Sequence, residues 1–268
     1  MDFDFMEWLN LAARWVHVFA GILWVGSTYY FTWLDGRFTE EETAANPKPQ
    51  VWMVHSGGFY VVEKTKVPDL TRHLHWFRWE AATTWLSGIV LLALVYYHGG
   101  LMVDASVRDL SDAAAIGIGV AVLFFGWPVY DGLMLSPLGK SDRLAALIFF
   151  GLIVLLAWGL SQVLSARAAY MHIGALFGSI MTANVWMRIL PAQRRMIAAA
   201  REGKQPDAVL SARAKLRSKQ NTYLAVPVVF IMISSHYPAA TYGNRYGWLV
   251  LSAMVLLGWG AAKLIRRA

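Results

Sequence analysis

The chain has 268 residues, of which 57% are hydrophobic and only 15% are charged, and its formal net charge is +7. Roughly a quarter of the residues in a soluble domain are charged, so this composition excludes an ordinary soluble protein and indicates one that lies in a lipid bilayer. The sequence contains no cysteine, which excludes disulfides, thiolate metal sites, iron–sulfur clusters and covalent c-type haem attachment within this chain.

Seven segments approach the length needed to cross a membrane, which takes about 20 mainly apolar residues. In chain order they are 9–34, 77–98, 113–131, 143–163, 168–190, 222–237 and 246–264. The sixth is the weakest because it is short and contains Pro227, which a membrane helix tolerates when its neighbours satisfy the freed carbonyl. We therefore predict an all-α integral membrane protein, a single transmembrane domain (residues 1–268) built as a bundle of about seven helices.

The loop charges predict the orientation of this bundle. Most of the Lys and Arg lie in loops 35–76, 132–142 and 191–221 and in the C-terminal tail, whereas loop 99–112 has three Asp and one Arg. Cytoplasmic loops carry the excess of Lys and Arg, so we predict a multi-pass protein of the bacterial inner membrane with a periplasmic N-terminus. The same rule accounts for the positive net charge, and we expect no nucleic-acid partner.

Two of the inside loops are more than connections. In loop 35–76 the stretch VWMVHSGGFYVVEKTKV predicts two short strands around a turn at 56–58, and hence a small cytoplasmic β-hairpin. Loops of this length are often functional in compact proteins. Residues 191–221 predict a polar helix or helical hairpin on the cytoplasmic surface, broken at 203–206. Between these loops, WPVYD at 127–131 places a proline and an acid at the inner end of the third helix, and we interpret it as a structural break.

Four histidines lie on four different predicted helices. Ionisable residues inside a membrane are costly, so each is a functional hypothesis. The predicted topology places all four near the outer face at a similar depth, and they are His17, His98, His172 and His236.

His17 and His172 have matching surroundings, since each is followed by glycine within two turns, at Gly21 and Gly178. Such glycines let a flat macrocycle or a neighbouring helix come close to the backbone. Neutral imidazole is an ordinary axial ligand of haem iron, and bundle cores are common haem sites. We therefore predict a b-type haem whose iron is bound by His17 and His172, with His98 and His236 as further cofactor contacts. The alternative is that these side chains hydrogen-bond to carbonyls or lie in the membrane interface.

A second polar cluster, HLHWFRWE at 73–80, opens the second predicted helix on the inner side. Arg offers a planar fork of donors and aromatic rings offer stacking, which suits a flat, anionic, hydrogen-bonding substrate. The alternative is an interfacial belt of aromatic anchors and snorkelling charges.

Three stretches together resemble a known family. WVHVFAGILWVGSTYYF in the first helix, HSGGFYVVEK in the hairpin and LHWFRWEAATTWLSG in the second helix are similar to the N-terminal domain of the membrane-bound, cytochrome c-fused urate oxidases (urate hydroxylases) of bacteria. The resemblance runs over most of the chain, and HWFRWEA is its most specific part.

This resemblance implies oxidation of urate to 5-hydroxyisourate, with electrons passed through b-type haem to a cytochrome c and no peroxide formed. The family's cytochrome c domain follows the membrane domain, but this sequence has no CxxCH. Our topology leaves residue 268 inside, and a periplasmic cytochrome c needs one more crossing. We therefore expect an eighth helix beyond residue 268, a protein without that domain, or a helix count that is off by one.

As a hypothesis, urate binds at the inner cluster, where Arg78 holds its anionic edge and a histidine or Glu80 accepts a proton as water adds. The predicted catalytic residues are His75, Arg78 and Glu80, and the predicted substrate contacts are His55, His73, Trp76 and Arg78.

Two other functions remain open. A non-catalytic b-type cytochrome that relays electrons between quinone and a periplasmic partner predicts haem without urate-dependent reduction. A His-lined metal or solute transporter predicts no haem and a repeat with broken helices at mid-membrane, but the sequence offers only one such break, at Pro227.

Overall fold

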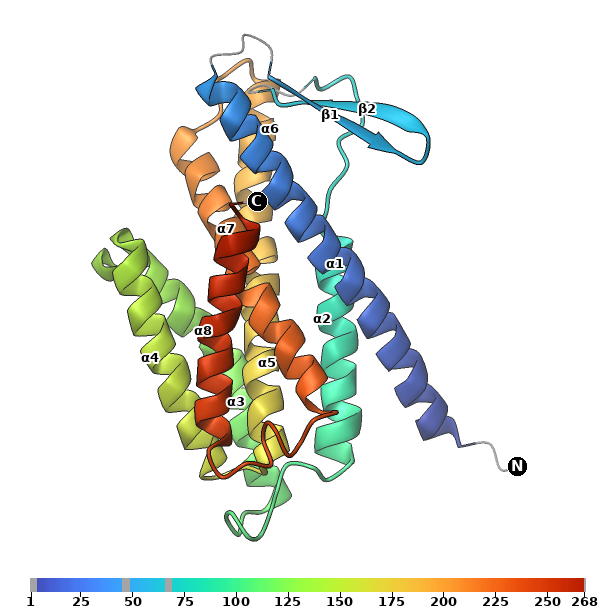
Figure 1. Ribbon diagram of the computed structural model, residues 1–268, viewed down its shortest axis with the longest axis vertical. Coiled ribbons are helices and arrows are strands. Elements are labelled where there is room, and N and C mark those ends of the chain that lie inside the picture. The colour runs from blue at the N-terminus through green and yellow to red at the C-terminus, as the bar shows by residue number, and fades with distance from the viewer. Residues whose placement is uncertain (1–3, 45–48, 66–68, 268) are drawn as a thin grey trace.

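The computed structural model describes residues 4–44, 49–65 and 69–267 as a bundle of long helices with one small β-hairpin at one end (Figure 1). The helices are α1 (Phe5–Thr43), α2 (Trp79–Leu92), α3 (Asp112–Leu135), α4 (Asp142–Ser161), α5 (Ala166–Ala183), α6 (Leu190–Arg201), α7 (Ala208–Ser234) and α8 (Gly247–Ile265). A π-helical turn, Ala93–His98, extends α2, and another, Asn184–Ile189, joins α5 to α6. A short 3₁₀ helix, Pro137–Lys140, precedes α4.

Serine side chains begin three of the helices. Ser111, Ser141 and Ser165 each accept a hydrogen bond from the backbone N–H three residues later, at the starts of α3, α4 and α5. Such caps satisfy one of the N–H groups that a first helical turn leaves unpaired.

Six helical segments in the described part of the chain are long and apolar enough to cross a membrane. They are Phe5–Thr43, Trp79–His98, Asp112–Leu135, Asp142–Ser161, Ala166–Arg201 and Gly247–Ile265. The prediction of an all-α, multi-pass membrane protein is confirmed.

The predicted sixth span, 222–237, falls mainly in the second half of α7 and is not among these six. The first half of α7 carries Arg213, Lys215, Arg217 and Lys219, which lower the hydropathy of the helix. α7 still packs inside the bundle, against α5 and α8.

Two helices run further than the sequence pattern predicts. α1 continues to Thr43, beyond the apolar stretch that ends at 34, and α5 continues without a break through the second π-helical turn into α6. Loop 191–221 is therefore α6 and the start of α7, joined by a turn in which Gly203 has a φ of +68°. The predicted helical hairpin and its break agree with this arrangement.

The predicted hairpin is present as β1 (Gln50–His55) and β2 (Gly58–Glu63), which pair antiparallel from Gln50↔Glu63 to His55↔Gly58. Both turn residues, Ser56 and Gly57, have positive φ, as a two-residue type I′ turn requires. One face of the hairpin packs Val51 against Leu34 and Phe38 of α1. We call this end of the bundle the hairpin end; α3 and α8 end there, and α2 and α4 begin there (Figure 1).

α5 is the central helix and contacts α2, α3, α4, α7 and α8. Small residues bring its neighbours close: a Cβ on Gly174 of α5 would lie 2.7 Å from Ile231 of α7, and one on Gly258 of α8 would lie 2.9 Å from the ring of Pro227. The proline thus lies where α8 comes closest to α7, and close packing of this kind is typical of membrane helices.

Candidate functional site

His17 on α1 leans against α2. Its Nδ1 lies 2.9 Å from the carbonyl oxygen of Thr84 and 3.2 Å from Oγ of Ser87, and a Cβ on Gly88 would lie 2.9 Å from its ring. Donation from Nδ1 to the carbonyl leaves Nε2 with a free lone pair, and no described residue hydrogen-bonds to Nε2. Metal-binding histidines are commonly oriented in this way, so His17 could hold the iron of a haem through Nε2.

His172 on α5 is enclosed on all sides. It is 0% exposed, its Nδ1 donates to the Ala168 carbonyl at 2.8 Å, and its Nε2 lies 3.2 Å from the hydroxyl of Tyr97. A Cβ on Gly119 of α3 would clash with Nε2. Both ring nitrogens have partners and no space remains beside Nε2, so His172 does not fit the predicted role of haem ligand.

The structure does not bring His17 and His172 together. His17 contacts the middle of α2, between Thr84 and Gly88, whereas His172 contacts Tyr97 in the π-helical turn that follows α2. At 1.5 Å per residue, Gly88 and Tyr97 are about 13 Å apart along the axis. The expectation of equal depth is therefore wrong. α1 is inclined to the bundle, so position along this helix does not give depth in the bundle (Figure 1).

The other predicted cofactor contacts lie apart from both rings. His98 ends the π-helical turn after α2 and His236 follows α7, and both are exposed. Gly21 faces Thr84 of α2, while a Cβ on Gly178 would meet nothing within 4 Å. Within the described ranges, no group of three or more His, Asp or Glu side chains could hold a metal ion.

The 73–80 stretch places a cation between aromatic rings. Residues 73–76 have no regular structure and lead to α2, and the guanidinium of Arg78 lies 5.8 Å from the ring of Trp76 and 5.3 Å from that of Trp79. His73 and His75 are exposed and Glu80 is partly buried in the first turn of α2.

The last of the predicted substrate contacts, His55, lies away from this stretch. It ends β1 at the tip of the hairpin, which projects sideways from the bundle (Figure 1).

A buried ion cluster lies near the hairpin end. Asp131 of α3 is 5% exposed and accepts hydrogen bonds from Arg188, at 3.0 Å for Nε, and from Arg217 of α7, which is also 5% exposed. We interpreted the 127–131 stretch as a structural break, but α3 continues through Pro128 and presents Asp131 to two arginines. One carboxylate against two guanidiniums leaves an excess of positive charge, and Arg217 is the guanidinium that is buried, whereas the Arg188 side chain is 39% exposed.

Hydrogen bonds extend this cluster across the bundle. The hydroxyl of Tyr130 donates to Oε1 of Gln220 at 2.6 Å, and the same oxygen accepts from Nη1 of Arg217 at 3.2 Å. Asn184 donates from Nδ2 to Oδ1 of Asn221 at 2.9 Å, while its own Oδ1 is buried and has no partner among the described residues. The network links α3, α5 and α7 and leaves one acceptor unused.

A cavity of about 420 Å³ adjoins this network, between α3, α4, α7 and α8. Its volume is in the range of small-molecule sites, about 300–1,000 Å³. Its aromatic lining residues are Tyr130, Phe149, Tyr223 and Trp259. Its charged and amide lining residues are Asp142, Arg143, Lys219, Gln220 and Lys263.

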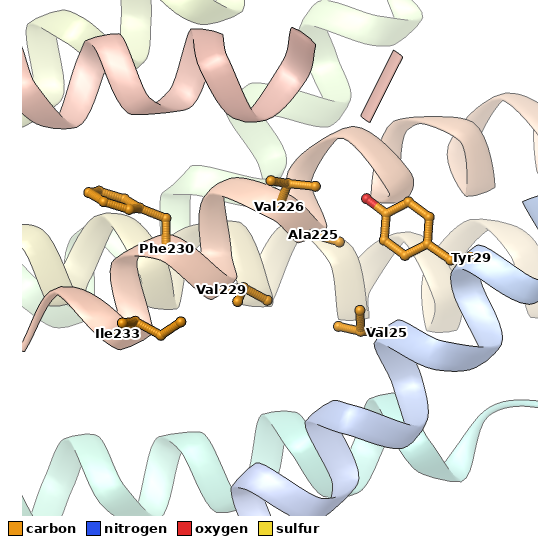
Figure 2. A pocket seen from close by; sticks show the side chains of 7 residues that line it. All are labelled: Val25, Tyr29, Ala225, Val226, Val229, Phe230 and Ile233. Carbon is orange, nitrogen blue, oxygen red and sulfur yellow. The ribbon is translucent and has the colours of Figure 1, made fainter. Parts of the chain in front are cut away.

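A second cavity, of about 380 Å³, lies between α1 and α7 (Figure 2). Val25 and Tyr29 of α1 face Val229 of α7 across it (Figure 2). Its lining is apolar except for the hydroxyl of Tyr29, which already donates to the carbonyl of Thr222 at 3.1 Å. This cavity offers apolar contact but no free polar group.

Sequence reasoning missed the first cavity because its residues come from four separate segments. Arg217, Lys219 and Gln220 belong to the basic stretch that the positive-inside rule explained as a whole. The one available signal was Asp131, an acid at the end of an apolar run, which needs a buried cation as partner.

Comparison with known protein families assigns the chain to one of them. Residues 4–266 match the family model described as "Urate oxidase N-terminal". No curated protein and no solved structure matches the chain. Because the family match covers nearly all of the sequence, the chain belongs to the urate oxidase N-terminal family.

Proposed function

We propose that this protein is a membrane-bound urate oxidoreductase that converts urate to 5-hydroxyisourate and passes the electrons through b-type haem to a cytochrome c. The observation that carries the proposal is the family match over residues 4–266. In this reaction urate takes up the oxygen atom of water and releases two protons and two electrons. Electrons that leave through a cytochrome c do not reduce oxygen, so no hydrogen peroxide forms.

His17 is the residue that we assign to hold the haem. Its Nδ1–H is held by the Thr84 carbonyl, which fixes the ring and leaves Nε2 free to bind iron. A haem bound there would supply one-electron acceptance and transfer. The enclosed ring of His172 does not support its assignment as a second haem ligand, and we assign it to packing between α2, α3 and α5.

Two places at the hairpin end combine cations with aromatic rings, as a flat anion requires. One is the predicted site at 73–80, where Arg78 lies between two tryptophans. The other is the cavity between α3, α4, α7 and α8. The roles of His75, Arg78 and Glu80 remain predictions, and the two places are compared below.

The visible spectrum tests the proposed function. The protein is purified in detergent, its oxidised spectrum is recorded, and urate is added without oxygen. We expect a Soret band that shifts, with sharp α and β bands, because urate reduces the haem. Haem that is reduced only by dithionite would contradict urate oxidation and favour an electron relay, whereas a colourless protein would contradict both and favour a transporter.

A pair of variants tests the assignment of His17. We expect His17→Ala to lose most of the haem, measured as pyridine haemochrome per protein, because Nε2 is the ligand. Val18→Ala is the matched control, since this neighbouring side chain is 53% exposed. Equal haem content in the two variants would remove His17 from the site.

A further inference from the structure

We infer that the cavity between α3, α4, α7 and α8 is the urate site and binds the purine as a flat anion. The inference rests on the proposed function for the identity of the ligand. It concerns different residues from those at 73–80, so the two locations can be separated by experiment.

The aromatic lining suits a flat ring. Trp259 of α8 and Phe149 of α4 stack with an interplanar angle of 12° and a centroid distance of 6.3 Å. Tyr130 meets Phe149 edge to face at 5.2 Å. These rings present flat and edge surfaces from three helices, against which a purine can stack.

The charges suit an anion. Three cations line the cavity against one carboxylate, and Lys219 is paired with that carboxylate, Asp142, at 2.8 Å. Arg143 and Lys263 have no ion-pair partner among the described residues. The Asp131 cluster, behind Tyr130, adds a further excess of positive charge. A urate anion would supply the negative charge that the lining lacks.

One unused hydrogen-bond donor suits a carbonyl oxygen of urate. The indole N–H of Trp259 is buried and has no partner within the described residues, although Trp259 lines the cavity. A buried donor without a partner costs stability, and a ligand acceptor removes that cost. On the opposite wall, Gln220 is held by Tyr130 and Arg217, so this side of the cavity is positioned in advance.

The rival location at 73–80 is less complete. There the guanidinium of Arg78 lies over two indole rings, and its buried Nε also lacks a hydrogen-bond partner among the described residues, but His73 and His75 are exposed to solvent. The cavity instead is lined by residues from the start of α4 and the end of α8, Asp142, Arg143 and Lys263, which lie at the hairpin end. Urate would therefore enter from the side that the loop charges predict to be cytoplasmic.

Direct binding of urate tests the inference. The full chain is reconstituted in phosphatidylcholine nanodiscs, and bound radiolabelled urate is measured by equilibrium dialysis. For the double variant Arg143→Gln/Lys263→Gln we expect about tenfold weaker binding, since two exposed charge contacts together contribute about 1.4 kcal/mol. The matched control, Arg201→Gln/Arg213→Gln, removes the same charge from the same end without touching the lining, and should bind as the unmodified chain does.

Trp259→Phe is the second variant. It keeps an aromatic ring against Phe149 but lacks the indole N–H, so binding should weaken about fivefold, as for the loss of one hydrogen bond. An unchanged melting temperature shows that the variant is folded. If Trp259→Phe has a lower melting temperature, the test rests on the binding measured for Arg143→Gln/Lys263→Gln.

Three outcomes would overturn the inference. In the first, the cavity variants bind urate normally while Arg78→Gln loses it, which places urate at 73–80. In the second, they bind urate normally but retain less copurified phosphatidylglycerol, which makes the cavity a lipid headgroup site. In the third, the unmodified chain binds no urate, which removes the proposed function as well. Urate binding that depends on the cavity but reduces no haem would leave the inference standing and contradict the proposed function alone.

Discussion

Two guanidiniums, those of Arg188 and Arg217, converge on the carboxylate of Asp131 in the bundle interior. Each also lies over an aromatic ring: Arg188 is 5.6 Å from that of Trp127 and Arg217 is 5.2 Å from that of Tyr130. The carboxylate and the two aromatic rings together offset the cost of desolvating the two guanidiniums. At the scale of single residues, Asp131 is thus a buried carboxylate with two cationic partners.

Asp131→Asn should therefore destabilise the protein strongly, by about 3–5 kcal/mol, because it leaves two arginines without a counter-charge. Thermal unfolding in detergent, followed by circular dichroism, measures the effect. Glu202→Gln is the control: it breaks an exposed pair with Lys204 and should cost less than about 1 kcal/mol. Similar melting temperatures for both variants would show that the cluster does not hold the helices together.

At the scale of elements, the contact between α1 and α2 depends on glycines. Gly88 leaves room for the ring of His17, and Gly21 brings α1 against Thr84. Elsewhere α1 has few buried residues, and side chains such as Trp15 and Ile22 are 74% and 65% exposed, as suits a helix that faces lipid. The orientation of His17 therefore depends on this one contact with α2.

Gly88→Ala tests that dependence. Its Cβ would lie 2.9 Å from the ring of His17, so the ring must move, and we expect about 1–3 kcal/mol of destabilisation together with reduced haem content. Gly26→Ala, where a Cβ meets nothing within 4 Å, is the matched control and should be neutral or slightly stabilising. Normal haem content in the Gly88 variant would indicate that the position of His17 is unimportant for the cofactor.

At the scale of the whole molecule, the two ends of the bundle differ in the elements that they carry. The hairpin end carries the hairpin, α6 and the basic start of α7, whereas the described connections at the opposite end, 99–111, 162–165 and 235–246, contain no helix or strand (Figure 1). The cavity adjoins the hairpin end, and the exposed His98 and His236 lie at the opposite end. The positive-inside rule predicts that the hairpin end faces the cytoplasm.

Single cysteines test this orientation directly, because the chain has none of its own. Gln205→Cys, in the exposed turn between α6 and α7, should react with a membrane-impermeant maleimide only after the cells are opened. Ala105→Cys, in the exposed loop between α2 and α3, should react in cells whose outer membrane alone is permeabilised. The reverse pattern would invert the topology and place urate binding on the periplasmic side.

The sequence by itself determined the membrane class, six of the crossing helices, the hairpin and the family. Each of these depends on local information: an apolar run of sufficient length, a turn with glycine at positive φ, or a specific motif. Only the tertiary structure decided the depth of His17, the enclosure of His172, the pairing of Asp131 with Arg217 and the cavity lined by α3, α4, α7 and α8. These features depend on how helices that are far apart in the sequence tilt, extend and pack against one another. The hydropathy of one helix does not specify which helices pack against it.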